Sequence, residues 1–239
     1  MGDYYLVTTA PYQEITGTIP QIQSIRSRVP IGRQYIPPSS FRNKTISKNY
    51  KPEDVKLEKG AKITSCLRGA AYTFPYQLVI DEAFLKLLEQ WKGAPFDYTP
   101  LNVYDNKGIC HQYYFLNYLE PASSDLINWE KSSFKAYDPA VYGYVPAGPV
   151  HSLSEYKRAD IIFDKIVLNV DLLEDWHHFT VPVTMLWLIT GSFFEAIKEA
   201  NITGISVYRY DRGHDISTDP NPGRERPLYP EVKRKKFKY

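Results

Sequence analysis

Along this chain the spacing of hydrophobic and polar residues predicts more strands than helices. Residues 3–9 are mostly aromatic and β-branched, and they predict an opening strand. Residues 10–60 hold repeated prolines and no helical periodicity, so we expect loops and short strands there. Residues 62–67 predict the next strand, which Gly69 ends.

The first helical pattern begins at Asp81, a residue type that favours the N-cap position. Apolar residues then recur at the spacing of one helix face until Gly93 and Pro95 end the pattern. This stripe consists of Phe84, Leu87, Leu88 and Trp91. Strands are predicted on both sides, at residues 76–80 and 101–104, which makes a strand, helix, strand unit.

A second unit of the same design is predicted near the end of the chain. Residues 183–189 predict a strand, and Ser192 to Glu195 have the spacing of a capping box. The apolar stripe of this helix is Phe193, Ala196, Ile197 and Ala200. Asn201 and Gly204 end it, and residues 205–208 predict a closing strand. Units of this kind are common, so an internal repeat is left open.

Further strands are predicted at residues 112–119, 161–163 and 166–168, whereas the glycines and prolines of 136–149 indicate a loop or an edge strand. Two helices among about eight strands favour an α+β fold with mostly antiparallel sheets. A parallel α/β fold would place a helix after nearly every strand.

The length of 239 residues is sufficient to bury a core without disulfides or metals. We expect residues 1–220 to form one α+β domain, or alternatively a lobe at 1–70 beside a region at 75–210. Residues 221–239 are expected to form a basic tail. The aromatic share of 15%, with 20 tyrosines, favours both strands and protein-binding surfaces.

The net charge of +2 is unevenly distributed along the chain. Residues 221–239 hold seven Lys or Arg against two Glu, which leaves 22 basic and 25 acidic residues in the rest. A slightly acidic body argues against a nucleic-acid partner. Runs such as 233–236 are more typical of solvated chain ends than of anchors.

Several features predict a cytoplasmic protein. The start, Met1 to Tyr5, lacks the basic region and apolar run of a secretory signal. The most apolar stretch, 179–189, is shorter than the ~20 residues of a membrane-spanning helix, so no membrane association is expected. Cys66 and Cys110 lie far apart in sequence, and we expect two buried, reduced thiols.

The chain has no catalytic, phosphate-binding or metal-binding motif whose spacing would bring reactive groups together. The chain has no phosphate-binding glycine loop and no His-Glu-x-x-His. His177 and His178 would point to opposite faces of a strand, as would Cys110 and His111. His214 lies in a stretch of turn-forming residues. We therefore expect no catalytic residue, no cofactor and no metal.

One enzymatic alternative is left open, because carboxylate pairs converge only in the folded chain. A hydrolase or transferase would gather several of His111, His177, His178, His214, Glu174 and Asp175 in one pocket. A third hypothesis is a scaffolding module that uses the basic tail as its anchor.

Residues 113–119 read YYFLNYL, and residues 125–134 read DLINWEKSSF. These two stretches resemble a family of immunity proteins from bacterial polymorphic toxin systems, formerly a domain of unknown function. The consensus sequence of the family is Tyr-x-Leu-Asn-x-Leu, then Asp-x-Leu-Asp, then Glu-Lys-Ser and an aromatic residue. Asn128 stands where the second Asp is expected.

Later segments are similar to the same family. Residues 176–179 resemble its aromatic strand, and 186–194 its helix entry, although 189–192 read Ile-Thr-Gly-Ser in place of Val-Ser-Glu. Residues 196–205 resemble its closing helix and strand. The residues after Asp211 have no counterpart.

The resemblance implies an α+β protein, encoded beside a toxin, that binds and neutralises the toxin by stoichiometric association in the cytoplasm and is not an enzyme. It allows partner contacts at four positions: Asp125, Trp129, Glu130 and Ser132. The same residue types also suit caps, a turn and a structural Trp anchor. An inhibitory surface should be rigid, with aromatic anchors and charge complementary to the toxin.

Overall fold

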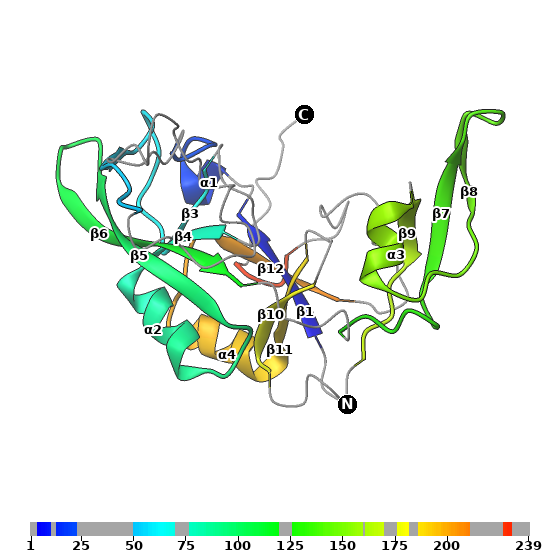
Figure 1. The fold of residues 1–239 in the computed structure, drawn as a ribbon. Coiled ribbons are helices and arrows are strands. Elements are labelled where there is room, and N and C mark those ends of the chain that lie inside the picture. Colours follow the sequence, from blue (N-terminus) through cyan, green and yellow to red (C-terminus); the bar gives the residue numbers. More distant parts are fainter. Residues whose placement is uncertain are drawn as a thin grey trace, which may run out of the picture.

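The chain has an α+β fold with largely antiparallel sheets, as the sequence predicts (Figure 1). The computed structural model describes residues 4–10, 13–22, 50–69, 77–119, 126–159, 161–169, 176–181, 186–210 and 227–230. Three sheets lie within these residues. Only the pair of β2 and β5 is parallel among the strand pairs described.

The first sheet joins the beginning of the chain to its end. Its strand order is β10 (His178–Thr180), β11 (Trp187–Thr190), β1 (Tyr4–Thr9) and β12 (Ile205–Arg209). Strand β1 is central and pairs antiparallel with both β11 and β12. Val207 also bridges Tyr229, so the chain after β12 returns to the outer strand of this sheet.

The second sheet has the strand order β2 (Val55–Lys56), β5 (Phe96–Tyr104), β6 (Cys110–Tyr118), β4 (Gln77–Asp81) and β3 (Cys66–Leu67). The predicted strand at 62–67 is thus reduced to its last two residues. The preceding backbone is held by other groups, because Lys62 N–H donates to the Thr16 carbonyl and Gln21 Nε2 donates to the Lys62 carbonyl.

Helix α2 (Glu82–Gln90) begins where the sequence predicts. The Asp81 side chain caps it by accepting a hydrogen bond from Phe84 N–H at 2.9 Å. Its buried face consists of Phe84, Leu85, Leu87 and Leu88. A short helix, α1 (Gln13–Thr16), precedes the second sheet. No helix among the described residues has the length and apolar character needed to cross a membrane.

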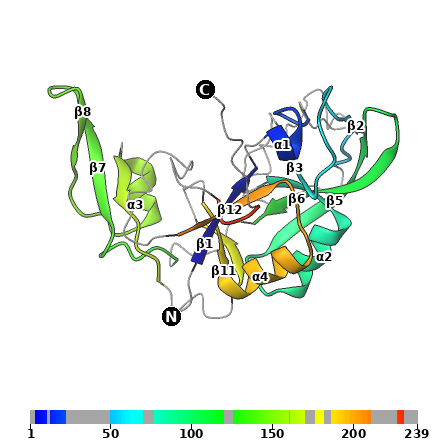
Figure 2. The ribbon, with the colours of Figure 1, turned by 180° about the vertical axis from the view of Figure 1, so that it is seen from behind.

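Helix α4 (Gly191–Glu199) starts earlier than predicted, and the proposed capping box at Ser192 is wrong. Thr190, the last residue of β11, occupies the N-cap, and its side chain accepts from Phe193 N–H. Because β11 leads directly into the helix, Ser192 falls within the first turn. Figures 1 and 2 show α2 and α4 lying side by side.

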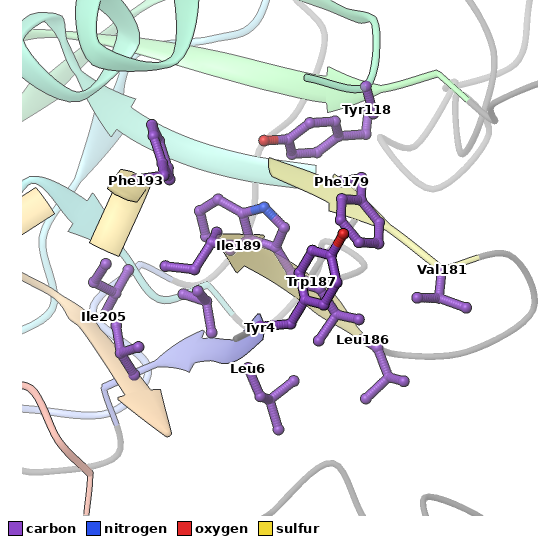
Figure 3. Packing of buried hydrophobic residues seen from close by; sticks show 14 of the residues in the cluster. Tyr4, Leu6, Tyr118, Phe179, Val181, Leu186, Trp187, Ile189, Phe193 and Ile205 are labelled. Carbon is purple, nitrogen blue, oxygen red and sulfur yellow. The ribbon is translucent and has the colours of Figure 1, made fainter. Parts of the chain in front are cut away.

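One large core joins these helices to both sheets. The Trp187 indole is fully buried at its centre, with ring centroids 6.0 Å from Phe84 and 6.1 Å from Tyr118. Figure 3 shows the surrounding side chains, which come from β1, β6, β10, β11, β12 and α4. A second cluster covers the other face of the five-stranded sheet and includes Tyr50, Val79, Leu101 and Phe115.

The third sheet lies apart from α2 and α4 and projects to one side in both ribbon views (Figures 1 and 2). Its strand order is β8 (Gly143–Pro146), β7 (Ser133–Asp138) and β9 (Ile161–Lys165). Residues 166–168, predicted as a strand, form only an isolated bridge between Leu168 and Ile127. Helix α3 (Leu153–Arg158) packs here and was not predicted, because its six residues are too few to show an apolar stripe.

The two cysteines differ, which corrects the expectation of two buried thiols. Cys66 is fully buried and Cys110 is exposed. Cys110 begins β6 beside the hairpin turn at Asp105, where the sheet meets solvent. Burial is the main cause that raises the pKa of the Cys66 thiol.

Gly93 is required by close packing. A Cβ at this position would overlap the ring of His178, which three hydrogen-bonding partners hold in place. We expect Gly93→Ala to lower the free energy of unfolding by about 1–3 kcal/mol through overpacking. Urea denaturation measures this effect, with Gly148→Ala as control, because a Cβ at Gly148 meets open space. Equal losses for the two variants would contradict the packing argument.

Candidate functional site

Three of the four residues that the resemblance singles out are described; Asp125 lies outside the described residues. Trp129 is only 9% exposed and packs against the rings of Phe134, Tyr156 and Phe163 at 5.8–6.2 Å. Its indole is therefore a core anchor of the third sheet. Glu130 beside it is exposed.

Ser132 stabilises the backbone through its hydroxyl group. Its Oγ donates to the carbonyl of Asn128 at 2.7 Å and accepts from Val167 N–H at 3.1 Å. The Asn128 side chain in turn accepts from Lys131 N–H. These bonds close the turn before β7 and tie it to the segment after β9. The structure thus gives Ser132 a local structural role, and Glu130 is the exposed one of the three described residues.

A polar hollow of about 460 Å³ lies beside this turn. Its lining comprises Ile127, Asn128, Trp129, Glu130, His151, Ser152 and Asn169. Ser152 is the N-cap of α3 and accepts from Glu155 N–H, while Glu155 accepts from His151 N–H. Two of the lining residues, His151 and Ser152, therefore take part in hydrogen bonds at the start of α3.

The most exposed apolar surface lies on the hairpin formed by β7 and β8. Eight large hydrophobic side chains are exposed among the described residues, and four of them belong to this hairpin: Tyr137, Val141, Tyr142 and Tyr144. We call these four side chains the hairpin surface. Tyr142 at the turn is 86% exposed. The concentration of half the exposed set on one projecting element marks it as the candidate functional site.

The two faces of this hairpin differ. Tyr137 and Tyr144 are paired across the strands and their rings meet edge to face at 5.7 Å. Phe134, on the opposite face, is buried against Phe163 and Tyr156 beneath α3. Phe134 thus anchors the base of the hairpin to its own core, and the outer face presents tyrosines to solvent.

The turn of the hairpin has an ordered and strained geometry. Asp138 Oδ1 accepts from Ala140 N–H at 2.8 Å. Tyr142 has a φ of 50°, in the left-handed region that bulky residues avoid. Such a conformation costs of order 1–3 kcal/mol, and in known proteins it is concentrated at functional sites. The hairpin turn thus holds Tyr142 in a costly conformation at the point where its side chain is most exposed.

The histidines proposed for an enzymatic site have separate surroundings. His178 is fully buried: its Nε2 lies 3.2 and 3.1 Å from the carbonyl oxygens of Leu88 and Trp91, and its Nδ1 lies 3.0 Å from the Tyr118 hydroxyl. Since a carbonyl can only accept, Nε2 carries the proton and Nδ1 accepts from Tyr118. His178 therefore satisfies the free carbonyls at the end of α2.

His177 and His111 each bind different groups. His177 Nδ1 lies 3.0 Å from Thr190 Oγ1, at the start of α4. His111 Nε2 lies 3.4 Å from Asp105 Oδ2, at the turn between β5 and β6. The other members of the proposed set, His214, Glu174 and Asp175, lie outside the described residues.

A second hollow of about 620 Å³ lies between α4 and residues 228–230. Its lining is mainly apolar and includes Phe194, Ile202 and Tyr229, with Lys198 held over the Phe194 ring at 4.8 Å. Tyr229 is fixed there by a hydrogen bond from its hydroxyl to the Ile202 carbonyl at 2.8 Å. The polar residues in its lining are Lys198, Asn201 and Thr203.

Within the described part of the chain, no three His, Cys, Asp or Glu side chains gather so that they could hold a metal ion. Neither a family model nor a curated protein matches the chain. The immunity-protein resemblance therefore stays a prediction.

Sequence reasoning missed the hairpin surface, since residues 136–149 were interpreted only as a loop or an edge. A signal was present: Tyr137 and Tyr144 flank a turn that contains Pro139 and Gly143. Two such aromatic residues face each other when the turn closes a hairpin.

Proposed function

We propose that this protein binds a cognate bacterial toxin, encoded beside its gene, and neutralises it by stoichiometric association in the cytoplasm of the producing cell. The observation that carries the proposal is the hairpin surface: three exposed tyrosines and a valine on one projecting, internally anchored hairpin. The sequence resemblance supplies the class of partner.

Tyrosine is well suited to protein recognition. Its ring offers a large contact area with few rotatable bonds, and its hydroxyl can pair with polar groups of the partner. Interface hot spots are accordingly enriched in Tyr, Trp and Arg. Phe134 anchors the base of the hairpin in its own core, and the Tyr137 and Tyr144 rings pack on each other, so part of this surface is ordered before binding and less entropy is lost on association.

Co-expression tests the proposal. Cells that produce the toxin encoded by the adjacent gene are expected to survive when they also produce this chain, and the two proteins should co-purify in a 1:1 ratio. Death of the co-expressing cells, together with no complex in titration calorimetry, would refute the proposal.

The hairpin surface yields a direct prediction. The double variant Tyr142→Ser and Tyr144→Ser should lose protection and bind the toxin at least tenfold more weakly, because two aromatic anchors are removed. Tyr98→Ser is the matched control, since Tyr98 is also an exposed tyrosine but lies on β5. Equal protection by the double variant and by the control would place the interface elsewhere.

A further inference from the structure

We infer that the tip of the β7–β8 hairpin inserts into a concave, largely uncharged cleft of its partner, with both faces of the hairpin in contact. This inference rests on the proposed function and specifies the kind of surface that the partner offers.

The hairpin surface is too small for a stable complex if it makes contact through one face only. From the exposed fractions of its four side chains, a flat contact would bury roughly 400–500 Å². Stable interfaces bury about 800 Å² on each partner. A cleft that encloses the tip also covers Pro139, Ala140 and the inner face near Val145, which adds area that a flat contact would leave exposed.

The outer strand of the hairpin has few outward backbone N–H groups with which a strand of the partner could pair. Ala147 N–H donates to the Phe134 carbonyl, and the register then places the pairs Ala136 with Val145 and Asp138 with Gly143 in hydrogen-bonded positions. Within the outer strand β8, only Tyr144 and Pro146 therefore point their backbone groups away from β7. Proline has no N–H, so only one outward donor is left in β8. Recognition must depend on side chains.

The tip carries almost no charge. Between Tyr137 and Pro146 the only charged residue is Asp138, and one of its oxygens is already bonded to Ala140 N–H. Charged side chains in the cleft of the partner would lose their hydration on binding, and the hairpin tip has almost no opposite charges to pair with them. The complementary surface is therefore apolar or polar and uncharged, with acceptors for the tyrosine hydroxyls. The absence of a basic side chain from 137–146 argues against a nucleic-acid ligand at this site.

The test measures the affinity of the full chain for the purified toxin encoded by the adjacent gene, using isothermal titration calorimetry. Tyr142→Gly removes the tip side chain and relieves the positive φ, so the fold should be retained while affinity falls at least tenfold. Val145→Asp places a charge on the inner face and should also lower the affinity for the toxin at least tenfold. Ser133→Ala, at the base of β7, should bind like the wild type. Circular dichroism checks that each variant is folded.

The outcomes separate this inference from the proposed function. Weaker toxin binding by both Tyr142→Gly and Val145→Asp, with wild-type affinity in Ser133→Ala, supports insertion into a cleft. Weaker binding by Tyr142→Gly alone indicates a flat contact and overturns the inference. Wild-type affinity in both Tyr142→Gly and Val145→Asp also overturns it, and the proposed function survives either result. If the wild type does not bind the toxin at all, the proposed function fails and the inference fails with it.

Salt provides a second readout. Affinity should change by less than tenfold between about 0.1 and 0.5 M NaCl, because few charges are paired across the interface. A steeper loss would contradict the uncharged cleft.

Discussion

Replacing Trp187 with alanine is expected to lower the free energy of unfolding by about 3–5 kcal/mol, the usual cost of removing a large aromatic side chain from a core. The indole is fully buried where the two helices meet both sheets, so no side chain can move from the surface to fill the space. The indole also packs against the Tyr118 ring, with centroids 6.1 Å apart, and the variant loses that contact.

Urea denaturation followed by far-ultraviolet circular dichroism measures this loss without relying on tryptophan fluorescence. Trp176→Ala is the matched control, because Trp176 is half-buried at the edge of the same core. Its ring centroid lies 6.4 Å from that of Phe179. We expect a loss of about 1–2 kcal/mol there. A smaller loss at Trp187 than at Trp176 would mean that the core is not centred on β11.

Stability is expected to fall by about 3 kcal/mol between pH 7 and pH 4 because of His178 alone. Burial lowers the pKa of this imidazole from 6.5 to about 4 in the folded chain. The unfolded chain binds a proton near pH 6.5, whereas the folded chain does not, so unfolding is favoured as the pH falls. At ~1.4 kcal/mol per pH unit, the interval from 6.5 to about 4 gives this value.

The sign of this effect distinguishes His178 from a salt-bridged histidine, whose contribution would be lost as the pH rises. Here the stabilisation is complete above about pH 6.5 and decreases toward pH 4. His178→Gln can still donate to the helix carbonyls but does not titrate, so its stability should decline less steeply over the same range. Parallel curves for the wild type and His178→Gln would show that the imidazole is accessible to solvent.

Local signals in the sequence were sufficient for the elements that local interactions define. The N-cap at Asp81 and the apolar spacing behind it located α2, because both depend on residues within one or two turns. The cap of α4 was misplaced because Ser192 and Thr190 are both good cap residues. The choice between them depends on where β11 ends, which its pairing with β1 determines.

The candidate site could be predicted only in part, since exposure is a property of the whole fold. Trp129 and Tyr142 are both aromatic residues near turns, yet packing under α3 buries the first and the hairpin presents the second to solvent. The same holds for Cys66 and Cys110. Cys66 packs into the large core although β3 is an edge strand, whereas Cys110 lies at the exposed end of the central strand β6.

The central position of β1 in its sheet affects how the chain folds during synthesis. Val7 pairs with Trp187 on one side and Val207 on the other, so β1 finds these partners only after 180 to 200 further residues have been synthesised. At ~5–20 residues per second this delay is roughly 10–40 s. During translation the apolar side chains Leu6 and Val7 remain uncovered, and a nascent chain stalled before β11 is the form most exposed to aggregation and chaperone binding.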